Sequence, residues 1–303
     1  MKWIVRRYGR QLAKGQRAEL CLYDVASGAT NVLLASAQVI EAPNWTPDGE
    51  RLLFNAGGEL WFIDVAEPAA PVKLGTGRLN DFNNDHLISP DGGTVYASSD
   101  DGRIYAIPIG GGTPSRVEGR SAANHRRYLH GISPDGRTLL YVGLEKERGK
   151  VRTNLFSIPA EGGENRRLTD LAEPHDGPEY SPDGVWIYFN SERASPGHAQ
   201  CFRMLAAEDG HLEQLTDDAR VNWFPHPSPD GRSVVYLSYP PGTQGHPADR
   251  DVILRLMNPD GSGQRDLISC DGGQGTINVN SWAPDSRRFA FVAYPRAIET
   301  GRR

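Results

Sequence analysis

Histidine, asparagine and aspartate side chains gather three to seven residues before a set of regularly spaced Pro-Asp pairs. These residues, with two other side chains that accompany them, are Asn84, His86, Arg127, His130, His175, Asp176, Asn222, Trp223, His226, Asn278 and Asn280. Imidazole, amide and carboxylate groups hydrogen-bond to sugar hydroxyls, and neutral imidazole is a common metal ligand. The pattern therefore predicts a site for a polar ligand or for a metal ion.

Three interpretations of these residues stay open on the sequence alone. Their side chains could satisfy backbone groups and hold water in a wet channel. They could bind a small polar ligand such as a sugar or an oligosaccharide. Alternatively, one divalent metal ion could bind to the four histidines of the set, His86, His130, His175 and His226. No two of them have the spacing of a local metal motif, so this site would depend on the folded chain bringing them together.

The Pro-Asp pairs reveal an internal repeat. They begin at Pro47, Pro90, Pro134, Pro182, Pro229 and Pro284, which lie 43 to 55 residues apart. Proline presets the first central position of a turn, and the glycine that usually follows Asp suits a left-handed conformation. A short apolar run follows each turn, such as 52–54 or 186–189. This period and this turn chemistry are typical of four-stranded propeller blades.

The two ends of the chain complete the count of blades. The last repeat ends after two strands, and the chain begins with an unmatched pair of strands at 19–25 and 31–35. Pairing the first strands with the last closes a ring and removes exposed sheet edges. We therefore expect residues 1–303 to form one all-β, six-bladed β-propeller. The expected blades are 42–78, 85–119, 129–169, 177–216, 224–269, and 279–295 together with 18–35.

Strand alternation predicts which face of the ring binds. The Pro-Asp turns are short and uniform, so we expect their face to be structural. The opposite face receives long connections at 143–153, 191–200 and 238–251, and unequal loops on a uniform scaffold usually carry binding. The histidine-bearing segments reach the same face and are expected to converge around the axis. His246, in the longest connection, either covers this opening or stays in solvent.

Composition narrows the possible partners. The formal net charge of −5 gives no electrostatic footprint for nucleic acid or an anionic membrane. No apolar stretch is long enough for membrane insertion or for a signal peptide, so we expect a cytoplasmic protein. A periplasmic chain whose leader had been removed would look the same. Three separated cysteines indicate reduced thiols.

The sequence resembles the TolB-like propellers with Pro-Asp repeats. The resemblance rests on the repeated Ser-Pro-Asp-Gly turns, on Trp45 and Trp282 before the first and last Pro-Asp pairs, and on the Leu-Thr pairs at 168–169 and 215–216. The resemblance covers residues 18 to 295 and implies that the first strand of each blade lines a central channel. TolB itself is periplasmic, has an extra N-terminal α/β domain and works in the Tol–Pal system. This sequence shows neither a leader nor room for that domain, so a Tol–Pal role is not expected.

Three functions compete on this basis. The first is binding of a polar, carbohydrate-like ligand or of a protein partner at the channel mouth. The second is a metal-dependent, carbohydrate-active enzyme that resembles oligogalacturonate lyase, in which a metal held by His86, His130, His175 and His226 would acidify a uronate α-proton. The third is a scaffold for protein assembly that uses residues 238–251. The sequence leaves open whether the protein catalyses a reaction.

Overall fold

Side chains close the Pro-Asp turns. In the fourth turn Ser181 Oγ donates to Asp183 Oδ1 at 2.5 Å and accepts the backbone N–H of Trp186 at 2.9 Å. The hydrogen bond from Ser181, with help from a backbone N–H, lowers the pKa of the Asp183 carboxyl. The same two contacts recur at Thr46, Ser89, Ser133 and Ser228. Each turn therefore fixes the first residues of the strand that follows it.

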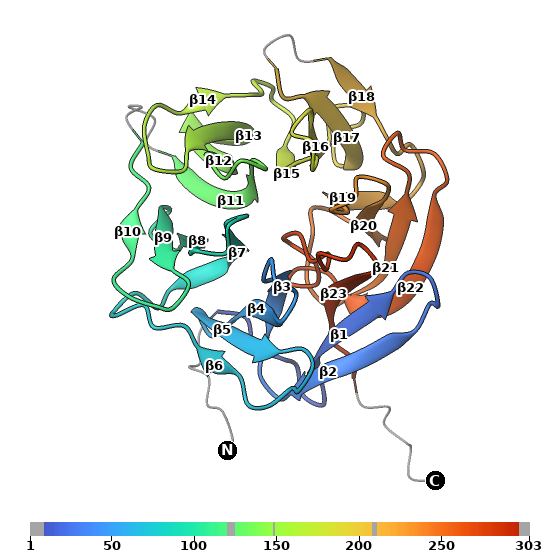
Figure 1. The fold of residues 1–303 in the computed structure, drawn as a ribbon. Coiled ribbons are helices and arrows are strands. Elements are labelled where there is room, and N and C mark those ends of the chain that lie inside the picture. The colour runs from blue at the N-terminus through green and yellow to red at the C-terminus, as the bar shows by residue number, and fades with distance from the viewer. Residues whose placement is uncertain (1–8, 120–124, 148, 208–210, 297–303) are drawn as a thin grey trace.

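The strands between these turns form six antiparallel sheets around a central axis (Figure 1). The computed structural model describes residues 9–119, 125–147, 149–207 and 211–296. In these ranges it contains twenty-three strands, and no helix there is long and apolar enough to cross a bilayer. The predicted all-β, six-bladed propeller is confirmed.

Five blades have four strands each, which follow chain order from the axis outward. The innermost strands are β3 (Glu41–Trp45), β7 (Phe82–Ile88), β11 (Arg126–Ile132), β15 (His175–Tyr180) and β19 (Val221–Pro227). The second strands are β4 (Arg51–Ala56), β8 (Thr94–Ser99), β12 (Thr138–Glu147), β16 (Trp186–Ser191) and β20 (Val234–Tyr239). The third strands are β5 (Glu59–Asp64), β9 (Ile104–Pro108), β13 (Lys150–Pro159), β17 (Gln200–Leu205) and β21 (Arg250–Met257). The outermost strands are β6 (Val72–Lys73), β10 (Ser115–Arg116), β14 (Arg166–Arg167), β18 (Leu212–Gln214) and β22 (Arg265–Gly272).

The sixth blade joins the two ends of the chain, as predicted. Its middle strand β1 (Ala18–Asp24) pairs with β2 (Thr30–Ser36) on one side and with β23 (Arg288–Ala293) on the other. Its innermost segment differs from the expectation because it is held to β23 only by an isolated bridge between Trp282 and Phe289 and by a few other backbone hydrogen bonds. Side chains of other blades hold this segment instead, as described below.

One of the three predicted long connections is wrong. Residues 143–153 form the end of the hairpin of β12 and β13, whose pairing continues to Glu147 and Lys150. The sequence pattern did not distinguish this two-stranded ribbon from a loop, because a run of charged residues hides the apolar alternation of a strand. The other two connections lie outside strands, between Ser191 and Gln200 and between Tyr239 and Arg250.

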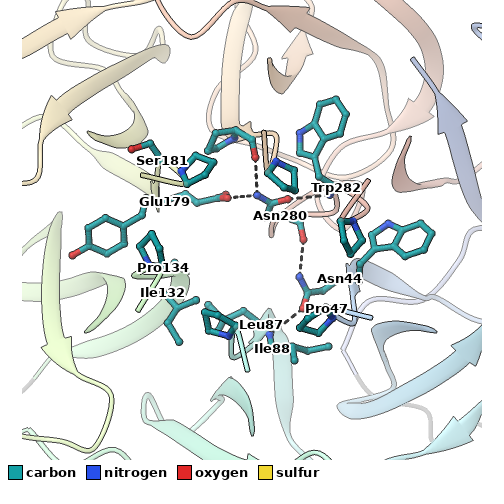
Figure 2. A pocket seen from close by; sticks show the side chains of 18 of the residues that line it. Asn44, Pro47, Leu87, Ile88, Ile132, Pro134, Glu179, Ser181, Asn280 and Trp282 are labelled. Atoms are coloured by element: carbon teal, nitrogen blue, oxygen red, sulfur yellow. Dashed lines mark hydrogen bonds between the residues drawn. The ribbon is translucent and has the colours of Figure 1, made fainter. Parts of the chain in front are cut away.

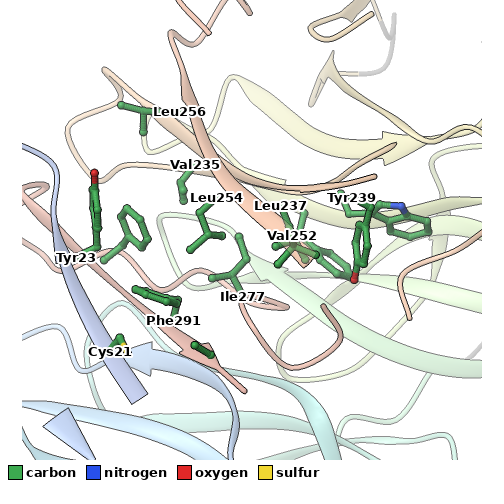
Figure 3. Packing of buried hydrophobic residues seen from close by; sticks show 14 of the residues in the cluster. Cys21, Tyr23, Val235, Leu237, Tyr239, Val252, Leu254, Leu256, Ile277 and Phe291 are labelled. Atoms are coloured by element: carbon green, nitrogen blue, oxygen red, sulfur yellow. The ribbon is translucent and has the colours of Figure 1, made fainter. Parts of the chain in front are cut away.

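The turn prolines ring the channel on one face (Figure 2), and the apolar core lies between neighbouring blades rather than at the axis. Between the fifth and sixth blades, for example, Leu237 and Leu254 belong to the same apolar cluster as Tyr23 and Phe291 (Figure 3). All four side chains are buried, so each blade stabilises the next through the hydrophobic effect. This leaves the inner strands free to present polar groups to the channel.

Candidate functional site

The channel holds a cavity near each face of the ring. The first, here called the loop-side cavity, has a volume of about 380 Å³ and is lined among others by Asp85, Tyr128, His130, Asp176, Phe224 and His246. The second, here called the proline-side cavity, has a volume of about 410 Å³ and is lined by the six turn prolines with Trp45, Ile132, Tyr180 and Trp282. The loop-side cavity carries the buried charges of the channel mouth.

His130 lines both cavities. Its Nε2 lies 3.1 Å from Asp176 Oδ1, and its Nδ1 lies 3.2 Å from the backbone oxygen of Asn278. Because both partners are acceptors, each ring nitrogen must carry a proton. Burial alone would lower the pKa of this imidazole, but Asp176 and Asp85 outweigh burial and raise it to about 9. His130 is therefore an imidazolium at neutral pH and has no free lone pair.

Asp85 is the second carboxylate of the loop-side cavity, beside Asp176. It is 4% exposed, and its Oδ2 accepts a hydrogen bond from Asn83 Nδ2 at 2.8 Å. Among the residues that the structure describes, no cationic group lies within ion-pair distance of Asp85. Burial raises the pKa of Asp85 to about 6, although the positive charge of His130 favours the ionised carboxylate and acts to lower the pKa. Asp85 is thus an incompletely compensated buried charge.

The long connection after β20 reaches over this cavity through His246. The Nε2 atom of His246 lies 3.6 Å from Asp176 Oδ2, and its Nδ1 contacts Gln274 Oε1. Its ring centroid is 4.5 Å from that of Trp223 and 5.2 Å from that of Phe224. His246 therefore lines the cavity and is not a loop residue free in solvent.

Phe224 supplies an aromatic wall at the cost of backbone strain. Its φ is 54°, a left-handed conformation that is rare for a bulky residue, and its side chain is 1% exposed. The ring stacks on His130 with centroids 5.9 Å apart. Tyr128 is a second aromatic residue in the same lining. Strained residues of this kind concentrate at ligand sites.

The proline-side cavity has a hydrogen-bonded floor (Figure 2). Glu179 accepts from His226 Nδ1 at 2.5 Å and from Asn280 Nδ2, which also donates to the backbone oxygen of Pro227 at 3.0 Å. Asn44 Nδ2 donates to the backbone oxygen of Asn280 at 2.7 Å. These contacts satisfy the side chains of Glu179, Asn280 and Asn44 within the protein.

The same network holds the innermost segment of the sixth blade. His226 Nε2 lies 2.6 Å from the backbone oxygen of Ile277, and His130 Nδ1 contacts that of Asn278. Trp282 Nε1 donates to the backbone oxygen of His226 at 3.0 Å. Two histidines from other blades therefore hydrogen-bond to backbone oxygens that, in a regular strand, would accept hydrogen bonds from β23.

The predicted site residues divide into three groups. Asn84, His130, Asp176 and Asn278 line the loop-side cavity, and Trp223 packs behind it against His246. His226 and Asn280 belong to the floor of the proline-side cavity. The remaining four, His86, Arg127, His175 and Asn222, line neither cavity.

Each of these four is held within or between blades. His86 is fully buried beside the backbone of Leu53 and Ala42, and burial lowers the pKa of its imidazole to about 4. The other three contact neighbouring strands or loops: Arg127 Nη1 donates to the oxygen of Val117 at 3.1 Å, His175 Nδ1 lies 2.9 Å from Ser191 Oγ, and Asn222 Nδ2 donates to Gln200 Oε1 at 2.9 Å. The expected convergence of four histidines on the axis is wrong.

Strand pleating and a bulge explain the error. Arg127, His175 and Asn222 stand seven residues before their prolines and face into the blade, whereas Asp176 and Asn278 stand six before and face the channel. The register then shifts in each regular inner strand, with positive φ five residues before the proline at Ala42, Gly177 and Phe224. A bulge changes which later side chains face the axis.

Sequence reasoning also missed the proline-side cavity and its Glu179. A signal was present, because large side chains recur two residues before the turn prolines at Trp45, Ile88, Ile132, Tyr180 and Trp282. No signal marked Tyr128 or Phe224, whose positions depend on the fold.

The four histidines do not fit a divalent metal ion. His130 has both nitrogens engaged, and His86 and His175 lie away from the cavities. Across the described residues, no group of three or more His, Cys, Asp or Glu side chains is arranged to hold a metal ion. A metal-dependent reaction therefore cannot be derived from this set.

Comparison with known proteins identifies similar chains. An uncharacterized protein of Agrobacterium fabrum is 40% identical over 283 residues, which cover 92% of both chains. The solved structure of a TolB-like protein from Agrobacterium tumefaciens is 39% identical, with a TM-score of 0.85 over 93% of this chain and 99% of that one. No protein-family model matches the chain.

More distant similarities cover two proteins of established name. The Tol-Pal system protein TolB of Francisella tularensis is 22% identical over 286 residues, and the match spans 92% of this chain but 61% of TolB. An oligogalacturonate lyase in complex with manganese has a TM-score of 0.57 and 18% identity over 87% of this chain and 74% of the lyase. At this identity the likeness to the lyase shows a shared fold alone.

Proposed function

Because the chain belongs to the TolB-like family of six-bladed β-propellers, we propose that it binds a small polar, carbohydrate-like ligand in the loop-side cavity. The observation that carries this proposal is the combination of buried charge and aromatic wall in one enclosed space. Asp85, Asp176 and His130 stand beside Tyr128 and Phe224 in a cavity of about 380 Å³. Small-molecule sites typically combine a concave, partly apolar wall with a few converging polar groups.

The protonation of His130 favours binding over catalysis. A general base needs a free lone pair, and both nitrogens of this ring face acceptor oxygens. The imidazolium instead fixes Asp176 and the segment at Asn278, so it keeps the lining in one arrangement. A preorganised polar lining reduces the entropy lost on binding.

The proline-side cavity is the alternative binding site. A matched pair of variants, one in each cavity, distinguishes between the two sites. Tyr128 and Tyr180 are both half-buried, and each lines a different cavity. We expect Tyr128→Ala to weaken the binding of mono- and oligosaccharides about fivefold, because stacking on an aromatic face contributes on the order of 1 kcal/mol. Tyr180→Ala should leave the affinity unchanged.

Isothermal titration calorimetry with a panel of neutral sugars measures both variants against the unmodified chain. Loss of binding in Tyr180→Ala with retention in Tyr128→Ala would move the site to the proline-side cavity. Absence of binding by every sugar, together with capture of a protein by the intact chain, would favour a role in protein assembly.

A further inference from the structure

Among the described residues of the loop-side cavity, the imidazoles within ion-pair distance of a carboxylate both contact Asp176 rather than the buried Asp85. Asp176 has His130 as its counterion at 3.1 Å. Among the described residues, the side-chain donor to the Asp85 carboxylate is the amide of Asn83. The charge of His130 acts on Asp85 without a hydrogen bond, because the two ring nitrogens of His130 contact Asp176 and the backbone oxygen of Asn278. Arg126 also lines the cavity, but it is exposed and donates to the backbone oxygen of Asp100 at 2.8 Å. A buried carboxylate in this state favours a cation.

Glu41 makes the negative surroundings of Asp85 stronger. It is a neighbouring channel residue whose nearest cation, Arg10, lies 3.9 Å away and also binds Asp249. Burial raises the pKa of Glu41 to about 7, and Asp85 adds to this effect. Asp85 therefore interacts with two like charges, those of Asp176 and Glu41.

The rest of the lining suits an organic cation better than a metal ion. Phe224 and Tyr128 present aromatic rings in the same cavity, and ring faces attract ammonium groups. The amides of Asn84 and Asn278 add hydrogen-bonding groups for hydroxyls. The described residues offer no set of three metal ligands there. The volume of about 380 Å³ admits a small hydroxylated molecule.

Resting on the function proposed above, we propose that the ligand of the loop-side cavity carries a protonated amine, as an amino sugar does, and that this ammonium group pairs with the carboxylate of Asp85. The ammonium supplies the missing counterion. The hydroxyl groups of the ligand hydrogen-bond to the amides of Asn84 and Asn278, and its ring lies against Phe224 and Tyr128.

The affinity for an amine should depend on pH through Asp85. The groups that act on it are His130, Asp176, His246 and Glu41, with the amide of Asn83. Because the pKa of Asp85 is about 6 without ligand, its carboxyl is mostly protonated at pH 5 and mostly ionised at pH 7. A cation binds the ionised form, so an amine should bind several-fold more weakly at pH 5 than at pH 7.

Isothermal titration calorimetry with glucosamine, glucose and glucuronate at pH 7 tests this proposal. We expect glucosamine to bind at least about tenfold more tightly than glucose, as a charge-assisted hydrogen bond requires, and glucuronate to bind most weakly. Asp85→Asn should abolish the preference for the amine, and a circular dichroism spectrum and unfolding midpoint close to those of the unmodified chain show that the variant is folded. Asp251→Asn, the same change at an exposed carboxylate of β21, should keep the preference.

Equal binding of glucosamine and glucose, or a preference that survives Asp85→Asn, overturns the proposal and leaves the polar site in place. Tighter binding of glucuronate makes the cavity an anion site. Absence of binding by all three sugars counts against the polar-ligand function itself, and the amine proposal falls with it.

Discussion

A single imidazole at the axis links the charge of the channel to its shape. His130 donates to a carboxylate of the fourth blade and to the backbone of the sixth, so one protonated ring joins three blades. His130 is buried and Asp176 is half-buried, so removal of the carboxylate would leave a buried charge without its counterion. Sequence reasoning placed His130 and Asp176 at the channel, but it could not tell that the ring is fully engaged.

This ring should make stability fall with rising pH in a defined window. The folded pKa of His130, about 9, lies above the usual value of 6.5, so its stabilising contribution is complete below pH 6.5 and is lost as the pH rises through 9. We expect the free energy of unfolding in urea to decrease by a few kcal/mol between pH 7 and pH 9.

His130→Gln serves as the comparison, because a neutral amide does not titrate in this window. Asp85, whose pKa is about 6, has largely ionised before this window. Glu41, whose pKa is about 7, completes its ionisation early in the window and adds the same small fall in stability to both chains. An equal fall in stability for His130→Gln and for the unmodified chain would show that His130 is not the titrating group.

At the scale of the strand, the turn was predictable and the bulge was not. The Ser-Pro-Asp-Gly turn is made by residues adjacent in sequence, so its hydrogen bonds follow from local chemistry. The left-handed residue of the inner strand is glycine only at Gly177, whereas the first and fifth blades place Ala42 and Phe224 there. Neither residue signals positive φ, so the side chains that face the axis could not be assigned.

The bulge also makes a prediction about stability. Ala42 has a φ of 54° and is fully buried. Replacement by glycine relieves a left-handed conformation that costs an alanine about 1 kcal/mol, so we expect Ala42→Gly to raise the free energy of unfolding by about 0.5–1 kcal/mol.

Ala97→Gly is the matched control, because Ala97 is equally buried in β8 without positive φ. Glycine should destabilise that strand by about 1 kcal/mol. Chemical denaturation of the two variants measures both effects. Destabilisation of similar size in both would mean that Ala42 is not strained.

At the scale of the whole molecule, ring closure was predictable because the two unmatched ends of the chain complement each other. The pairing of β1 with β23 follows that prediction. The sequence did not predict that His130 and His226 from other blades would hold the innermost segment of the sixth blade. These contacts give the channel two different cavities, one with satisfied polar groups at its floor and one with an uncompensated carboxylate. That asymmetry is the reason for proposing that a ligand binds in the loop-side cavity.

A crystal structure of the chain grown with glucosamine at pH 7 tests this assignment most directly. The account predicts electron density for the sugar in the loop-side cavity, with its amine within hydrogen-bond distance of Asp85 and its ring against Tyr128 or Phe224. Density in the proline-side cavity beside Glu179, with the loop-side cavity holding only water, would contradict it.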